Sequence, residues 1–321
     1  CLWFSGDKGL EDNKKVTPAG LINLFIVYIV WGSTYLAIRI GIRSGAGFEP
    51  FWFGGSRVFI AGIILLFWGL IRGKNLRPSR KDLFVLMGSG FLLWIGGNGL
   101  VVLAEQRVDS GIAALIIAST PIWVAFLDLI LDSRIPSLQV NLSLAIGFLG
   151  ILTLSYPVLT SGVRADLIPI LLLLLASFSW SSGLVLQTRH PVEMNRGVSS
   201  GYQQLFGGIF FAIIALIVRE PIPSPTPDAW MAWGYLVVFG SVIAFTSFVS
   251  ALQQLPTRLV TTYPYVNPVI AVFLGWLILG EPITIWTIGG GVLVLIGVAG
   301  IYRASYKNIK ADEKDQPSLA N

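Results

Sequence analysis

Aromatic and polar side chains occur in the middle of long apolar stretches of this chain. Trp31 and Trp180 each lie about halfway through such a stretch, whereas most tryptophans of membrane proteins lie at the membrane–water interface. With nearby tyrosines they predict an aromatic wall with polar edges, suited to amphipathic solutes or organic cations. Structural packing is the alternative. The residues expected at this wall are Trp31, Thr34, Tyr35, Trp180, Ser181, Phe245, Tyr263 and Tyr265.

A second group of candidate residues shares one helix face in the third apolar stretch. Trp94, Asn98, Val101 and Glu105 recur every three or four residues, which places them on one side of a helix. Asn98 is too polar to face lipid. We therefore expect it to face a solute-binding cavity, and a hydrogen bond that bridges two helices is the alternative.

Two polar-proline pairs occur at corresponding places in the chain. Thr120-Pro121 and Asn267-Pro268 each lie within an apolar stretch. Proline removes a backbone donor and frees the carbonyl one turn earlier, and in lipid that carbonyl needs a partner from a helix, a side chain or water. One such proline is an ordinary kink. The pair predicts interrupted helices at Pro121 and Pro268 beside a transport site.

Four charged residues are candidates for binding or gating. Arg57 lies seven residues after Pro50, and it is either a structural arginine that reaches the interface or a cavity cation for a carboxylate. Asp128 lies near the end of its stretch, where a solvated side chain is the favoured interpretation. Glu105 and Glu281 lie at the ends of the third and ninth apolar stretches and are candidate gate residues. The alternative is that they are only hydrated, as carboxylates at helix ends often are.

Composition indicates that lipid surrounds the elements that position these residues. The 321 residues are 54% hydrophobic and 12% charged, against about 25% charged residues in soluble proteins. A spanning helix needs roughly 20 apolar residues, and the apolar runs do not alternate as barrel strands do. We predict an all-α membrane protein with ten spans at about 21–39, 50–71, 83–105, 111–131, 138–156, 167–188, 198–218, 229–252, 259–280 and 283–302.

The distribution of basic residues predicts the orientation of the chain. If the spans alternate, sixteen Lys and Arg lie on the side of the termini, five lie on the other side, and Arg57 lies in the bilayer. Excess Lys and Arg mark the cytoplasmic side. We therefore expect both termini to lie in the cytoplasm. The protein itself is expected in the inner or plasma membrane of the cell. The net charge of +5 is explained by this asymmetry, so we expect no nucleic-acid partner.

The chain repeats itself with an offset of about 147 residues. Residues 104–106 and 120–127 resemble residues 251–253 and 267–274, and shorter matches follow in the same order elsewhere. Five spans per half invert the second half relative to the first. We predict repeat 1 at 19–160 and repeat 2 at 163–304. Residues 1–18 form a polar segment that is expected to be either foreign to the natural protein or truncated, and the prediction of the fold does not use it. Residues 305–321 are expected to form a polar cytoplasmic tail.

Three motifs give the chain a family resemblance. Residues 31–35 (WGSTY), 97–99 (GNG) and 263–269 (YPYVNPV) with 279–281 (LGE) resemble the drug/metabolite transporter superfamily, and within it the EamA-type ten-helix exporters, over residues 20–303. The resemblance implies a central cavity lined by helices 1, 3, 4, 6, 8 and 9, cytoplasmic termini and alternating access. It implies export of small amphipathic metabolites, such as amino acids, or of drugs. Related carriers of phosphorylated solutes place basic residues in the cavity, a feature that the central helices here lack.

The alternatives to a transporter are an intramembrane enzyme and a membrane sensor or assembly scaffold. An intramembrane enzyme is disfavoured because the single histidine, His190, lies two helical turns from Ser182. A sensor or assembly scaffold needs no paired helix interruptions. We expect no cofactor and no metal site, and Cys1 is the only cysteine, with lipidation a minor alternative. The sequence leaves proton coupling, facilitated movement and the oligomeric state open.

Overall fold

A computed structural model describes residues 16–132, 138–160, 167–260 and 262–315. This described part of the chain is helical and contains no β-strand. In the first half the elements are α1 (Pro18–Ile42), α2 (Pro50–Ile71), α3 (Arg80–Gly90), η1 (Phe91–Gly99), α4 (Leu100–Glu105), α5 (Ser110–Ile117), α6 (Thr120–Asp132) and α7 (Leu138–Thr160). In the second half they are α8 (Ile168–Arg189), α9 (Arg196–Val218), α10 (Pro227–Tyr235), η2 (Leu236–Ala244), α11 (Phe245–Gln254), α12 (Thr257–Val260), α13 (Tyr263–Leu274), η3 (Gly275–Leu279) and α14 (Ile285–Asp315).

Seven helices of the described part are long and apolar enough to cross a membrane. They correspond to seven of the ten predicted spans, with α3, η1 and α4 forming one of them, α5 and α6 another, and α10, η2 and α11 a third. Shorter apolar helices occupy 138–154, 266–279 and 285–297, where the other three spans are expected. The all-helical membrane class is therefore confirmed, and the count of ten spans stays a prediction.

Local sequence explains where several helices begin. Thr17, Ser79 and Thr226 are N-caps whose side chains accept a hydrogen bond from a backbone N–H of the first turn of α1, α3 and α10. Proline occupies the start of α1 and of α10, where its missing N–H costs nothing. These caps fix the residues at which the apolar helices begin and the polar loops end.

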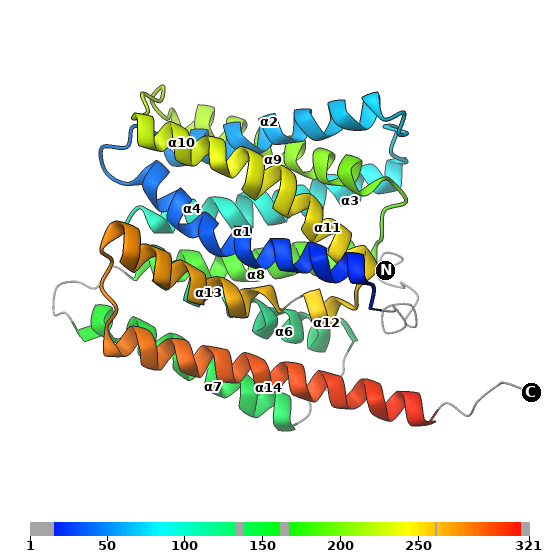
Figure 1. Cartoon of the computed structure of the whole chain (residues 1–321), viewed down its shortest axis with the longest axis vertical. Coiled ribbons are helices and arrows are strands. Elements are labelled where there is room, and N and C mark those ends of the chain that lie inside the picture. Colours follow the sequence, from blue (N-terminus) through cyan, green and yellow to red (C-terminus); the bar gives the residue numbers. More distant parts are fainter. Residues whose placement is uncertain (1–15, 133–137, 161–166, 261, 316–321) are drawn as a thin grey trace, which may run out of the picture.

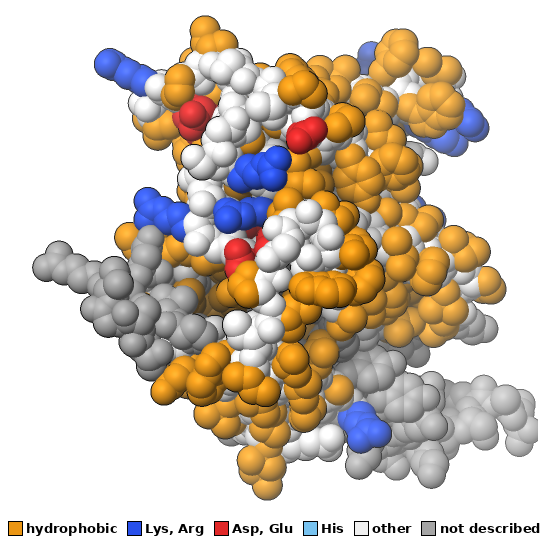
Figure 2. Space-filling model, turned by 60° about the vertical axis from the view of Figure 1, so that its left-hand side comes forward, with side chains coloured by type: hydrophobic (Ala, Val, Ile, Leu, Met, Phe, Trp, Pro, Cys, Tyr) orange, Lys and Arg blue, Asp and Glu red, His pale blue; other side chains and the backbone are white. Residues whose placement is uncertain are grey.

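The helices lie side by side in one bundle, and their axes run in roughly the same direction, from left to right in Figure 1. Both ends of the described chain, the start of α1 and the end of α14, lie at the right of this view. The loops 43–49, 106–109, 219–226 and 280–284 lie at the other end, which is called the Glu281 end below. Figure 2 shows this end turned forward, with charged side chains near its centre and a flank of hydrophobic ones, as expected for a lipid-facing surface.

The pattern of helix contacts is the same for the two halves. The most extensive contacts join α2 to α9 and α7 to α14, and the members of each pair hold equivalent positions in the two halves. Helix α1 packs on η2, α11 and α13 of the second half, and α8 packs on η1, α4, α5 and α6 of the first half. Exchanging these elements with their counterparts therefore gives a similar set of main contacts.

Glycines allow the paired helices to approach each other closely. A Cβ atom at Gly208 would lie 2.7 Å from the Cα of Phe59, and one at Gly62 would lie 2.7 Å from the backbone N of Leu205. Gly297 is equally close, 2.6 Å, to backbone atoms of α7. Such contacts between small residues drive helix association in lipid.

Two glutamates of the second half bind helix N-termini of the first half at the Glu281 end. The Glu281 carboxylate accepts hydrogen bonds from Ser110 N at 3.1 Å and Ser110 Oγ at 2.7 Å, at the start of α5. The Glu220 carboxylate accepts bonds from Phe51 N and Trp52 N, both at 2.9 Å, at the start of α2. Partial burial raises the pKa of Glu220, and these two amide bonds oppose the rise. A carboxylate at a helix N-terminus is stabilised by the free N–H groups and the helix dipole.

Replacing Glu281 by alanine is expected to destabilise the protein by about 1–2 kcal/mol, because α5 loses its capping carboxylate. Thermal unfolding in detergent measures this loss. Glu49→Ala is the matched control, since Glu49 precedes α2 at the same end and its side chain makes no capping hydrogen bond. Equal destabilisation by the two variants would contradict the capping role.

Candidate functional site

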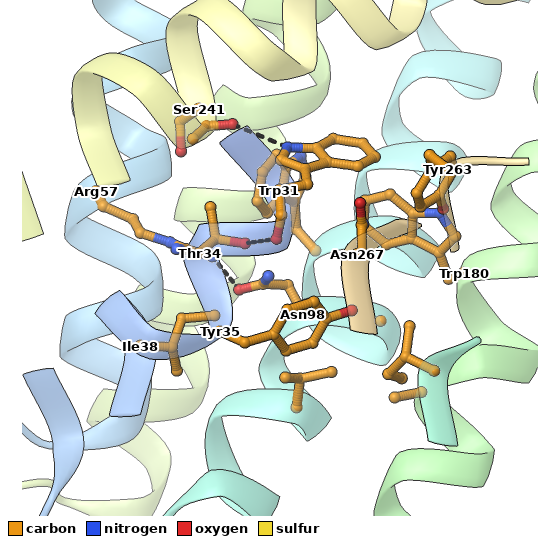
Figure 3. A pocket seen from close by; sticks show the side chains of 16 residues that line it. Trp31, Thr34, Tyr35, Ile38, Arg57, Asn98, Trp180, Ser241, Tyr263 and Asn267 are labelled. Atoms are coloured by element: carbon orange, nitrogen blue, oxygen red, sulfur yellow. Dashed lines mark hydrogen bonds between the residues drawn. The ribbon is translucent and has the colours of Figure 1, made fainter. Parts of the chain in front are cut away.

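A cavity lies between helices of both halves. Residues of α1, α2, η1, α4 and α5 line it from the first half, and residues of α8, η2 and α13 line it from the second. The lining residues are Trp31, Thr34, Tyr35, Ile38, Arg57, Trp94, Gly97, Asn98, Val101, Ile117, Ala176, Trp180, Gly240, Ser241, Tyr263 and Asn267. The side chains in Figure 3 converge on this space from several helices.

Trp31 is the centre of an aromatic cluster at one side of the cavity. Its ring lies edge-on to Trp180 and Tyr263, with ring centroids 5.4 and 5.1 Å apart. The buried Phe248 lies 4.9 Å from it. The Trp31 indole Nε1 donates to Gly240 O at 3.2 Å, which fixes its orientation. These rings form an apolar floor that an amphipathic solute would contact through its hydrocarbon part.

Arg57 supplies a cation to the cavity. Its side chain is 3% exposed, and it donates a hydrogen bond to Asn98 Oδ1 (Figure 3). The guanidinium carbon lies 5.8 Å from the Trp94 ring and 5.9 Å from the Phe53 ring, within cation–π range. Arg57 Nε has no hydrogen-bond partner among the described residues. Its hydrogen-bond and ring contacts are neutral groups, and the acidic charge that acts on it from nearby is that of Glu105.

The helix interruptions differ in one respect from the sequence prediction. The fourth span is interrupted between Ile117 and Thr120, directly before Pro121. In the ninth span α12 ends at Val260 and α13 begins at Tyr263, and Pro268 lies inside α13. The prediction of an interruption at Pro268 is therefore wrong in position. The repeat aligns Pro121 with Pro268, but Pro264 is the second residue of α13, as Pro121 is the second residue of α6. A proline in the first turn of a helix needs no N–H partner.

Polar side chains of the neighbouring helices bind each interrupted segment. In the first half, Ser177 of α8 bonds with Thr120 Oγ1 at 3.2 Å, and Ser181 Oγ donates to Thr120 O at 3.1 Å. In the second half, the Asn267 amide, in the orientation that satisfies both groups, donates to Tyr28 O and Tyr263 O at 3.1 Å.

The two sides of this arrangement are equivalent in sequence position. Ser177 lies three residues before Trp180, and Tyr28 lies three residues before Trp31. At the first interruption, the carbonyl of Ile117 accepts a hydrogen bond from Thr120 Oγ1 at 2.7 Å, so this backbone group is satisfied inside protein, as an interruption at membrane depth requires.

Wide-turn helical segments lie at equivalent positions of the third and eighth spans. Both η1 and η2 are π-helices of nine residues, and the cavity residues Trp94, Asn98 and Ser241 lie on them. Side chains from other helices bind their carbonyls: Ser179 Oγ donates to Leu92 O at 2.8 Å and Gln204 Nε2 to Ser241 O at 3.1 Å. Such segments are frequent at functional sites.

Most of the sequence-predicted residues line the cavity, and a few do not. Thr120, Ser181 and Phe245 are buried beside it. The side chain of Tyr265 lies outside the described part of the structure. Asp128 is exposed and pairs with Arg189 at 3.3 Å near the opposite end of the bundle from Glu281. Sequence reasoning did not predict several small or apolar lining residues, since their types carry no chemical signal: Ile38, Ile117, Ala176, Gly240 and Ser241.

Glu105 and Glu281 lie at the ends of the third and ninth spans, in different environments. Glu105 is 0% exposed, so hydration at a helix end does not describe it in this structure. Glu281 is partly exposed and held by α5. In the loop that follows Glu105, burial raises the pKa of Asp109, and the nearby charge of Glu281 raises it further.

A model of the EamA-like transporter family matches the chain twice, at residues 18–156 and 167–303. The chain belongs to the EamA-like transporter family. A relative named as the inner membrane transporter YedA of Escherichia coli (strain K12) is 37% identical over 265 residues, which cover 81% of this chain and 83% of the relative. The resemblance to EamA-type proteins is thereby confirmed, and the chain is a multi-pass membrane transporter of the inner-membrane type.

Other relatives are more distant. The transporter YoaV of Bacillus subtilis (strain 168) is 25% identical over 87% of this chain and 94% of its own length. An S-adenosylmethionine/S-adenosylhomocysteine transporter of Chlamydia trachomatis serovar L2 is 24% identical over 92% of each chain. A solved crystal structure has the same fold, with a TM-score of 0.65 and 18% identity over 94% of this chain and all of that chain.

Proposed function

We propose that this EamA-family member is a secondary transporter that exports small amphipathic solutes by alternating access through the cavity. Its repeats, 19–160 and 163–304, would form ten spans inverted across the lipid bilayer, with both termini in the cytoplasm. The observation that carries the proposal is the cavity itself, which lies between the halves and is lined by both of them. A solute bound there can be exposed to either side when the halves tilt against each other.

We infer a substrate class from the charge and the walls of the cavity. The Arg57 guanidinium is buried, is not paired directly with a carboxylate among the described residues, and lines the same cavity as Trp31, Trp180 and Tyr263. A solute that carries a carboxylate and an apolar or aromatic body satisfies both features. Amino acids and related metabolites belong to this class, and organic cations do not, because they would meet a like charge in a low-dielectric space.

The name of one relative supports the same class. Both solutes in that name combine an amino-acid carboxylate with an aromatic base, which an arginine beside indole rings suits. S-adenosylhomocysteine, a neutral thioether, fits the class fully, whereas S-adenosylmethionine also carries a sulfonium cation that the arginine would repel. At 24% identity the substrate itself does not carry over to this chain. A membrane sensor with the same fold is the second candidate, and it would bind such a solute without moving it.

Flux through the purified protein in proteoliposomes tests the proposal. We first expect amino acids and other amphipathic carboxylates, but not amines or inorganic phosphate, to raise the unfolding temperature in detergent. Trp31→Ala should then reduce flux of the stabilising solute about tenfold or more, because the floor loses its central ring. Trp286→Ala, outside the cavity, is the control. Binding of the solute by the natural sequence without any flux would favour the sensor.

A further inference from the structure

Glu105, the last residue of α4, is a buried ionisable group that does not line the cavity. The proposed binding of a solute therefore does not explain it. Its side chain is 0% exposed, and neither carboxylate oxygen accepts a hydrogen bond from any described residue. An ionised carboxylate has about four acceptor positions. Burying it charged and without donors is among the most unfavourable arrangements in a protein interior, whereas the neutral carboxyl is tolerated far better.

The charged groups around Glu105 are bound to other partners. Arg39 of α1 donates to the backbone oxygen of Glu105 and not to its carboxylate. Arg57 of α2 donates to Asn98. The nearby acidic charge is that of Glu281, which is held by α5. The loop that follows Glu105 carries Arg107 and Asp109.

The other helices packed on α4 add no charge near Glu105. η1 and α5 contain no charged residue, and the only charge of α8, Arg189, lies at the far end of the bundle. Tyr35 of α1 also interacts with Glu105, and its side chain is a phenol without a positive charge. Among the described residues none donates a hydrogen bond to the carboxylate, and the positive charges of Arg39 and Arg57 act on it without a direct contact.

Glu105 is also adjacent to the cavity. It lies one helical turn beyond Val101, which lines the cavity, and it shares a helix face with Asn98, the partner of Arg57. It lies at the end of the bundle where Glu281 and Glu220 join the two halves. Separation of the halves at this end would admit water to the carboxylate.

We propose that Glu105 binds a proton while the Glu281 end is closed, as in this structure, and releases it when that end opens. The proposal rests on the proposed transport function, because alternating access is what requires the end to open. The chain then carries a proton site that is distinct from the solute site at Arg57. The open form with hydrated, ionised Glu105 gains population as pH rises.

A buried cysteine reports the opening without any solute. Ala113 of α5 is 0% exposed, so Ala113→Cys, in a Cys1→Ser background, reacts with a water-soluble maleimide only when the end opens. The labelling rate is measured in detergent between pH 5.5 and 8.5, with Glu105 and with Glu105→Gln. Glutamine imitates the neutral carboxyl in size and charge. The ratio of the two rates at each pH cancels the pH dependence of thiol chemistry.

We expect this ratio to be near one at low pH and to rise with pH by up to about tenfold per pH unit, the limit for an opening that releases one proton. Glu105→Asp should keep the pH dependence. A ratio that is constant across the range would overturn the proposal.

A second measurement needs no change at Glu105, in case Glu105→Gln does not fold. Ile222→Cys, in a loop at the same end and 92% exposed, labels in every conformation. The rate at Ala113→Cys divided by that at Ile222→Cys should rise with pH in the presence of Glu105, and a constant quotient would contradict the proton site. Failure of the proposed transport would appear separately, as absent flux in proteoliposomes with the labelling pattern intact.

Discussion

Replacing Arg57 by glutamine is expected to weaken binding of a carboxylate solute about 100-fold. Removing one partner of a buried charged hydrogen bond costs about 2–5 kcal/mol, and about 2.7 kcal/mol is a hundredfold in the dissociation constant. Glutamine keeps a donor toward Asn98, so the local hydrogen bond can persist while the charge is lost. Titration calorimetry of the purified protein measures the change.

The uncharged amide of the same solute separates charge recognition from packing. It should bind the natural sequence weakly and should lose little affinity in Arg57→Gln. Arg72→Gln is the matched control, because Arg72 is exposed at the end of α2 and stacks on Trp68 outside the cavity. If the carboxylate and its amide lost affinity equally, Arg57 would support the cavity wall and would not read the charge.

Replacing Gly208 by valine is expected to destabilise the protein by about 3 kcal/mol, the upper range for overpacking. A Cβ there would lie 2.7 and 2.8 Å from the backbone Cα and N of Phe59. Backbone atoms cannot move aside as a side chain can, so α2 and α9 must separate. The unfolding temperature and the monodispersity of the detergent-solubilised protein measure the effect.

Gly234→Val is the control for helix propensity. Gly234 also lies in a helix, α10, but a Cβ added there would have no atom within 4 Å. Valine should therefore be tolerated at Gly234. Similar losses at the two positions would show that the close approach of α2 and α9 does not limit stability.

Much of the fold could be predicted because lipid restricts the choices. Apolar runs of spanning length and the repeat of about 147 residues indicate a duplicated helical membrane protein, and the family match agrees with this. Trp31, Trp180 and Asn98 could be singled out because such side chains are costly away from an interface. Their convergence on one cavity follows from the packing of α1, α8 and η1.

Other features depend on tertiary contacts that local sequence does not contain. The wide turns of η1 and η2 have no residue signature, since they are stabilised by donors such as Ser179 on another helix. The repeat pairs Pro121 with Pro268 and so predicts an interruption at Pro268, whereas the helix is interrupted before Tyr263 and continues through Pro268. Glu105 resembles a hydrated helix-end residue in the sequence, and it is buried because α1 and α5 pack over it.

The interchangeable contacts of the two halves have an energetic consequence. In the proposed alternating-access cycle, equivalent residues of the two halves would perform similar rearrangements at either end, which would bring the two end states closer in free energy. Only positions that break the duplication can tip this balance. Arg57 corresponds to Gln203 and Glu105 to Leu252, so in the proposed cycle these two charges, which the second half lacks at the equivalent positions, would contribute to its direction.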